Sequence, residues 1–142
     1  MAYVVDRARE PLVVIRYEGG VDDSEFRAYL AQYEALVAAG RRYTVIFDAR
    51  RASVPNAVQR RMQAQFLEAR AGDLSRLCLG GAFVIASPLI RGALTAILFL
   101  TPLPFEHVVV PTLEDGERWA LARLEGHGLL PRTPRTRTAS QP

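Results

Sequence analysis

The chain has 142 residues, of which 49% are hydrophobic and 23% charged; this is the balance of one ordinary globular domain and excludes intrinsic disorder over most of its length. The net charge is +3, and all 18 basic residues are arginine. Three of these arginines lie in the last twelve residues, so the rest of the chain carries 15 arginines against 15 acidic residues. This neutral body argues against nucleic-acid binding, because neutralising phosphate needs a clustered basic surface.

Cys78 is the single cysteine, so no internal disulfide can form, and no Cys/His spacing typical of a zinc site surrounds it. The first ten residues carry four charged side chains and lack the apolar core of a signal peptide. We therefore expect a cytoplasmic protein without a bound metal or other cofactor.

Two extended runs open the chain, at residues 3–6 and 12–17, and the second is rich in the β-branched residues that strands favour. A helix is predicted from Asp22, because Glu25 three residues later completes a capping-box pattern. Gly40 is a natural end for this helix.

A nearly continuous apolar run at residues 43–47 is typical of a central strand covered on both faces. A loop is predicted over residues 49–52, and Ser53 is then predicted to cap a second helix, with Pro55 in its first turn. We expect this helix to fray near Gly72.

Another buried strand is predicted within residues 79–86, followed by a helix that starts at Ser87 and Pro88. A short strand at residues 107–110 and a helix from Thr112 complete the pattern. This alternation predicts an α/β domain with a mixed, mostly parallel sheet of about five strands and an antiparallel strand at the N-terminal edge.

One domain is expected to span residues 1–128, because strands and helices alternate over that length without a linker or an internal repeat. The remaining residues, 129–142, are rich in arginine, threonine and proline and have no apolar periodicity. We predict that this tail is disordered.

Polar residues gather after the central strand, where open α/β sheets tend to bind ligands. Asp48, Arg50, Arg51 and Ser53 are the candidates for contact with a ligand or partner. Two readings stay open: Asp48 anchors a bound group or acts as an acid or base, or else Asp48 accepts from backbone amides while Ser53 caps a helix and the arginines are solvated.

A similar position follows the next buried strand, where Ser87 precedes a helix and Arg91 lies one turn into it. With Ser53, Ser87 offers two helix N-termini near one edge of the sheet, and such ends favour an anion. The alternative is that Ser87 and Pro88 only cap their helix.

The segment at residues 90–103 is apolar on nearly all sides yet too short to span a bilayer, so we expect no transmembrane segment. A helix of this kind must be covered by something. Leu98, Phe99 and Leu103 are the candidates for an outer face that forms a dimer contact or the wall of an apolar pocket. The alternative is that the whole helix is core.

Several stretches between residues 10 and 125 together resemble a known family: Glu18-Gly19-Gly20 after a strand, Val45-Ile46-Phe47-Asp48, Ala82-Phe83-Val84-Ile85, and Val108-Val109-Val110 before a helix bearing Trp119. They resemble the STAS/CRAL-TRIO-like group of small bacterial domains related to anti-sigma-factor antagonists. In such antagonists a phosphorylated serine or threonine lies in an Asp-Ser-Ser-Gly-like turn. The matching stretch here, Val54-Pro55-Asn56-Ala57-Val58, lacks that turn.

These observations favour a non-enzymatic regulatory or scaffolding module that acts through protein contacts, with an unknown protein partner or as a homodimer. The alternative is a protein that binds or senses a small apolar or amphipathic ligand such as a lipid, a use that the resemblance also implies. The ligand's anionic head would then meet Ser53, Arg50 or Arg91. An enzyme is a third reading, in which folding brings Asp48 to a histidine.

Overall fold

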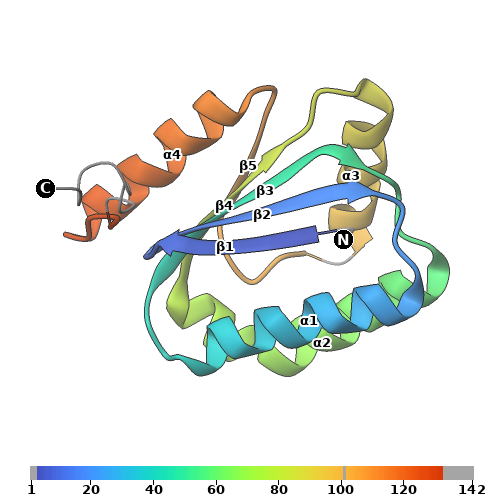
Figure 1. Cartoon of the computed structure of the whole chain (residues 1–142), viewed down its shortest axis with the longest axis horizontal. Helices are drawn as coiled ribbons and strands as arrows, with labels where there is room; N and C mark the ends of the chain where they lie inside the picture. The colour runs from blue at the N-terminus through green and yellow to red at the C-terminus, as the bar shows by residue number, and fades with distance from the viewer. Residues whose placement is uncertain (1–2, 101, 133–142) are drawn as a thin grey trace, which may run out of the picture.

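The computed structural model describes residues 3–100 and 102–132, and these form one five-stranded sheet with four helices (Figure 1). The strands lie in the order β1-β2-β3-β4-β5, with β1 antiparallel to β2 and every later neighbour parallel. The elements are β1 (Tyr3–Arg9), β2 (Leu12–Gly19), α1 (Asp23–Ala38), β3 (Tyr43–Ala52), α2 (Ala57–Leu77), β4 (Cys78–Val84), α3 (Pro88–Leu100), β5 (His107–Val110) and α4 (Leu113–Gly126). The predicted mixed, mostly parallel α/β fold is confirmed.

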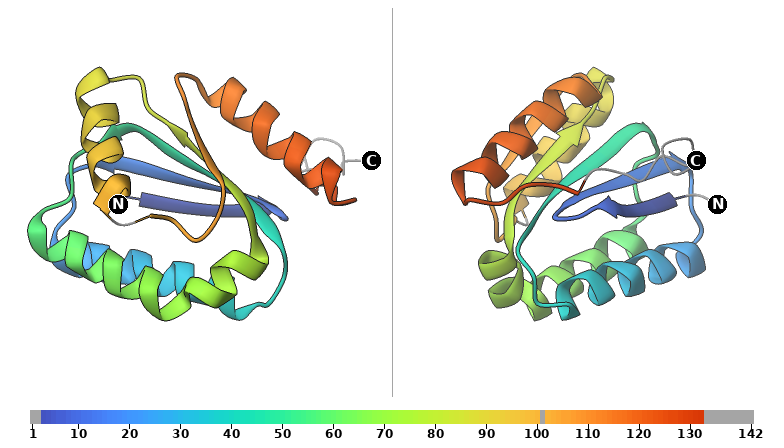
Figure 2. Two further views of the ribbon diagram at one scale, coloured as in Figure 1. Left: turned by 180° about the vertical axis from the view of Figure 1, so that it is seen from behind. Right: turned by 60° about the vertical axis from the view of Figure 1, so that its left-hand side comes forward.

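Helices cover the two faces of the sheet unequally (Figures 1 and 2). The helices α1 and α2 lie side by side on one face, and their apolar side chains form the larger core with the strands. The helix α4 lies on the opposite face over a smaller core. The helix α3 packs on neither face and stands across the carboxyl ends of the strands.

The strand β3 is longer than its apolar run predicts. Residues 43–48 are buried, as expected of a central strand, but the strand continues to Ala52 because β2 pairs with it through Glu18–Arg51 and Gly19–Ala52. The prediction of a loop at residues 49–52 was therefore wrong. A strand here fixes the side of the sheet to which each of these residues belongs.

The start of α2 also differs from the prediction. Asn56, not Ser53, is the N-cap, and its side chain and that of Gln59 form a reciprocal capping box. Pro55 lies before the helix, and no fraying occurs at Gly72, since α2 continues to Leu77 and leads directly into β4.

Residues 129–132 follow α4 back along the domain, where the backbone N–H of Arg132 donates to the carbonyl of Glu10 at 3.1 Å. The rest of the predicted tail, residues 133–142, lies outside the described residues. Within the described part of the chain, no helix combines the length and apolar character needed to cross a membrane.

Candidate functional site

A cavity of about 550 Å³ lies beneath α3, where the carboxyl ends of the strands meet the first turns of α1 and α2. One wall is aromatic and comes from β1, β2 and α1: Tyr3, Tyr17, Phe26 and Tyr29. The opposite wall comes from α3 and the segment after it: Ile90, Ala93, Leu94, Ile97, Leu98 and Leu103. The cavity exists because α3 stands across the end of the sheet and does not pack onto it.

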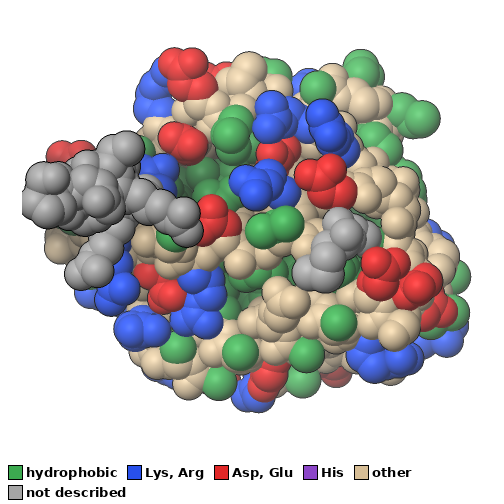
Figure 3. Space-filling view, viewed as in Figure 1, with side chains coloured by type: hydrophobic (Ala, Val, Ile, Leu, Met, Phe, Trp, Pro, Cys, Tyr) green, Lys and Arg blue, Asp and Glu red, His purple; other side chains and the backbone are tan. Residues whose placement is uncertain are grey.

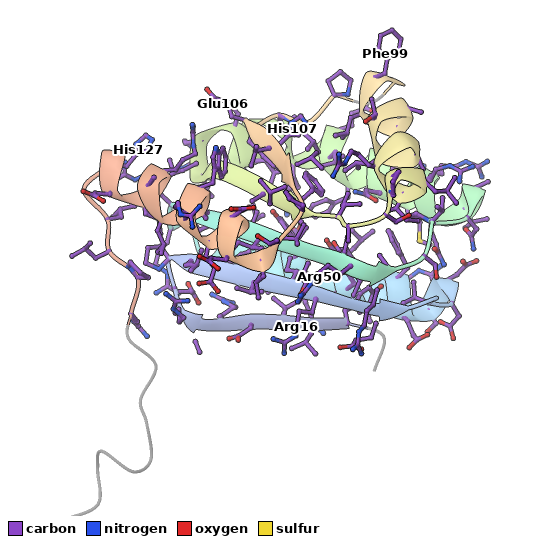
Figure 4. All side chains as sticks on the ribbon, turned by 90° about the horizontal axis from the view of Figure 1, so that it is seen from above. Arg16, Arg50, Phe99, Glu106, His107 and His127 are labelled. Carbon is purple, nitrogen blue, oxygen red and sulfur yellow. The ribbon has the colours of Figure 1, made fainter. Side chains whose placement is uncertain are left out.

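The helix α3 is the most apolar of the four helices, yet none of its described side chains is fully buried. Its inner side faces the cavity, whereas Leu89 and Phe99 on its outer side are 79% and 85% exposed. Figure 4 shows Phe99 pointing away from the body of the molecule, and in Figure 3 hydrophobic side chains reach the surface at the end that α3 occupies. The alternative that the whole helix is core is therefore wrong.

The three residues predicted as an apolar contact surface divide between the two sides of this segment. Leu98 and Leu103 line the cavity, and Phe99 faces outward. Leu98 and Leu103 thus have the position predicted for a pocket wall, and Phe99 has the position predicted for an external contact.

Charge is almost absent from the cavity lining. Among the described residues that line it, Arg60 on the first turn of α2 is the one charged residue, and none is acidic. The Arg60 guanidinium donates to the carbonyl of Pro55 at 2.6 Å, which holds the side chain at the rim. Sequence analysis missed Arg60, because its position depends on where α2 begins.

Gln59 braces the same corner of the cavity. Its side chain is only 2% exposed, and its amide nitrogen donates to the carbonyl of Val21 at 2.8 Å and to a carboxylate oxygen of Asp23 at 3.1 Å. These bonds join the starts of α1 and α2, so the polar corner of the cavity is rigidly built.

A pair of tyrosine hydroxyls adds a further polar group to the lining. The hydroxyl oxygens of Tyr17 and Tyr29 lie 2.9 Å apart, and either one can donate to the other. Burial raises the pKa of Tyr29 to about 12 and that of Tyr17 well above its usual value. Both side chains are therefore neutral phenols at physiological pH.

The polar residues predicted at the end of β3 do not gather at this cavity. Asp48 and Arg50 alternate with Ala49 and so lie on the face that α4 covers, beside Arg16 of β2 (Figure 4). Ala49 and Ser53 line the cavity instead. The sheet thus separates Asp48 from Ser53.

Asp48 is 5% exposed, and Arg50 is its hydrogen-bond partner. The Arg50 side chain donates to both carboxylate oxygens at 2.8 Å, and its backbone N–H donates at 3.3 Å. These hydrogen bonds lower the pKa of Asp48 below its usual range. The geometry is that of a bidentate ion pair that stabilises the end of β3.

The other predicted contact residues lie apart from one another. Arg51 is exposed and its guanidinium is 3.6 Å from Glu18. The Ser87 hydroxyl accepts from the backbone N–H of Ile90 at 3.4 Å as an N-cap, and Arg91 is exposed on α3. Neither Ser87 nor Arg91 lines the cavity, so of the predicted set only Ser53 belongs to it.

An acid–base pair between Asp48 and a histidine does not form among the described residues. His107 is at the start of β5 and His127 follows α4 (Figure 4), while Asp48 bonds only to Arg50. The described residues also contain no group of three or more His, Cys, Asp or Glu side chains that could hold a metal ion.

No protein-family model matches the sequence, and no curated protein does. Several solved structures share the fold, including the following two. One is an uncharacterised protein of the DUF3478 family with a SpoIIAA-like fold from Shewanella loihica, with a TM-score of 0.64 and 11% identity over 84% of this chain and 92% of that chain. The other is an anti-sigma factor antagonist from Mycobacterium paratuberculosis, with a TM-score of 0.53 and 17% identity over 83% of this chain and 92% of that chain. At these identities the similarity establishes the fold alone, and it confirms the predicted STAS-like fold.

Proposed function

We propose that the protein binds a small, predominantly apolar molecule in the cavity beneath α3. The observation that carries this proposal is the cavity itself: its volume of about 550 Å³ is within the range of small-molecule sites, about 300–1,000 Å³, and its lining is apolar with a few fixed polar groups. Arg60 at the rim favours an anionic head, in the role that the sequence suggested for Arg50 or Arg91.

The test is thermal unfolding of the purified protein with straight-chain fatty acids and ketones of eight to twelve carbons. A ligand at a hundred times its Kd stabilises a protein by about 2.7 kcal/mol, which raises the Tm of a domain of this size by roughly 5–10 °C. Native mass spectrometry then gives the stoichiometry.

Two matched variants locate the site. Ala64→Phe places a ring in the cavity and should abolish the shift in Tm, because Ala64 lines it. Ala69→Phe makes the same change on an exposed position of the same helix and should preserve the shift. No shift in the wild-type protein up to the solubility limit of every probe would refute the proposal.

A second candidate function, a regulatory or scaffolding contact with a protein, is supported by the exposed side chains of Leu89 and Phe99 and by the fold shared with an anti-sigma factor antagonist. Light scattering with chromatography tests its homodimer form. Because Phe99 is exposed, Phe99→Glu should leave the fold intact, and a wild-type dimer that dissociates in this variant would place the interface on α3. A monomer in both would argue against a homodimer.

The proposed role is non-enzymatic. Asp48 is paired with Arg50, away from the cavity, and burial raises the pKa of the Cys78 thiol to about 12, so Cys78 is not an activated nucleophile. The tyrosines of the cavity are protonated and donate hydrogen bonds. As neutral hydrogen-bond donors, these tyrosines are suited to binding and positioning a molecule.

A further inference from the structure

The hydroxyl pair of Tyr17 and Tyr29 has one more hydrogen than it uses. Two hydroxyls carry two hydrogens, and the bond between them, 2.9 Å long, consumes one. Among the described residues no other acceptor bonds to either hydroxyl. Tyr3, which packs against both rings, already donates to the carbonyl of Glu25 at 2.8 Å. The pair therefore has a donor hydrogen left over.

This remaining donor lies in an apolar setting. Tyr29 is 5% exposed, both tyrosines line the cavity, and the three tyrosine rings pack together with centroids 4.7–5.9 Å apart. A buried hydroxyl without an acceptor is unfavourable, because it loses the hydrogen bond that it makes to water. An occupant of the cavity that brings an oxygen acceptor restores that bond.

We propose that the Tyr17–Tyr29 hydroxyl pair binds an uncharged oxygen acceptor, a carbonyl or ether, carried by the apolar molecule in the cavity. This inference rests on the proposed function and names the class of ligand. A charged carboxylate is disfavoured at the pair, because the described part of the lining has no cation besides Arg60 at the rim. The cavity thus prefers a neutral oxygen-bearing molecule to a hydrocarbon of the same shape.

The test compares two probes, butyrophenone and n-butylbenzene, in which a carbonyl replaces a methylene. Titration calorimetry gives the Kd of each for the wild-type protein and for a double variant, Tyr17→Phe with Tyr29→Phe. Because a general change in the cavity affects the binding of both probes, it cancels in the ratio of the two affinities. We expect the double variant to lower the preference for the ketone about tenfold, the size of one lost buried hydrogen bond.

The chain contains a matched control. The hydroxyls of Tyr33 and Tyr43 form a second pair at 2.9 Å, which is more deeply buried, and neither residue lines the cavity. Replacing both residues with Phe also removes two hydrogen-bonded hydroxyls, and it should leave the ratio of the two probe affinities unchanged. If the first double variant fails to fold, infrared spectroscopy of butyrophenone bound to the wild-type protein replaces it. A hydrogen bond from the pair lowers the carbonyl stretching frequency relative to the ketone in a hydrocarbon solvent, and an unshifted band would overturn the inference.

The outcomes separate the two proposals. If both probes bind and the ratio is the same in wild type and in the Tyr17/Tyr29 variants, this inference is wrong and the proposed function stands; water then satisfies the hydroxyl. A fall in the ratio that also occurs in the Tyr33/Tyr43 variant would overturn it too. If neither probe binds the wild-type protein, this inference is wrong, and the fatty acids and straight-chain ketones decide the proposed function separately.

Discussion

Replacing Asp48 tests whether the polar residues at the end of β3 are structural or functional. Asp48→Asn keeps the shape of the side chain but removes the charge that receives two Arg50 donors at 2.8 Å. A hydrogen bond to a charged group contributes about 1.5–3 kcal/mol, and the half-exposed Arg50 reduces this through solvent screening. We expect a loss of about 1–2 kcal/mol in the free energy of unfolding and no change in probe binding.

Removing the partner of Asp48 should destabilise the protein more than removing the Asp48 charge. Arg50→Met leaves the Asp48 carboxylate, 5% exposed, without its partner, and an unpaired buried charge is more unfavourable than a missing one. We expect a loss of about 2–3 kcal/mol in the free energy of unfolding. Urea unfolding at pH 7 measures the stability of both variants. The loss of stability in the double variant should be closer to that of Asp48→Asn than to the sum of the two single losses.

The pH dependence has a definite sign. The pKa of Asp48 is lower in the folded protein than its usual value near 3.8, so its stabilising effect is complete above pH 5 and is lost as the pH falls through the folded pKa. The wild type and Asp48→Asn should therefore differ at pH 7 and converge only when the pH is below the folded pKa of Asp48. Equal stability at pH 7, or loss of probe binding in Asp48→Asn, would refute the structural assignment.

Two further substitutions test the packing around the cavity and α4. Gly80→Ala should lower the free energy of unfolding by about 1–3 kcal/mol, because the added Cβ would lie 2.6 Å from the Trp119 ring. Gly72→Ala in α2 adds a Cβ that meets no atom within 4 Å and should stabilise the protein slightly. Chemical denaturation measures the stability of both variants. Gln59→Leu should cost about 1–2 kcal/mol through its lost hydrogen bonds to Val21 and Asp23 and should weaken probe binding, and a variant as stable as wild type would contradict the bracing role.

The order of the elements could be predicted from the sequence because periodicity and capping agree over most of the chain. The capping box of Asp22 and Glu25 forms as predicted, and the apolar run at residues 43–47 is buried on both faces. At residues 53–59 Ser53 was predicted as the N-cap, but Asn56 has that role. Tertiary bonds from Gln59 to Val21 and Asp23 favour Asn56, and a local pattern does not contain them.

The membership of the site was harder to predict, because it depends on which side of the sheet each residue faces. A loop at residues 49–52 would allow Asp48, Arg50 and Ser53 to form one group. Because these residues form a strand instead, Asp48 and Arg50 lie on the α4 side of the sheet and Ala49 lies on the cavity side. The tyrosine pair was hidden for another reason. Tyr29 fits the apolar stripe of α1, so its hydroxyl gave no separate signal in the sequence.

The position of α3 connects these observations. A helix this apolar loses stability if both of its sides meet water, and packing on a sheet face is the usual remedy. Here α1 and α2 cover one face and α4 lies on the other, so α3 stands over the strand ends and encloses a cavity. Its inner side, including Ile90 and Leu94, would gain contact from a bound apolar molecule, and its outer side, with Phe99, would gain contact from a partner. Since both sides belong to one rigid helix, a ligand that shifts α3 also moves the outer surface, which is the physical route by which the two candidate functions would be coupled.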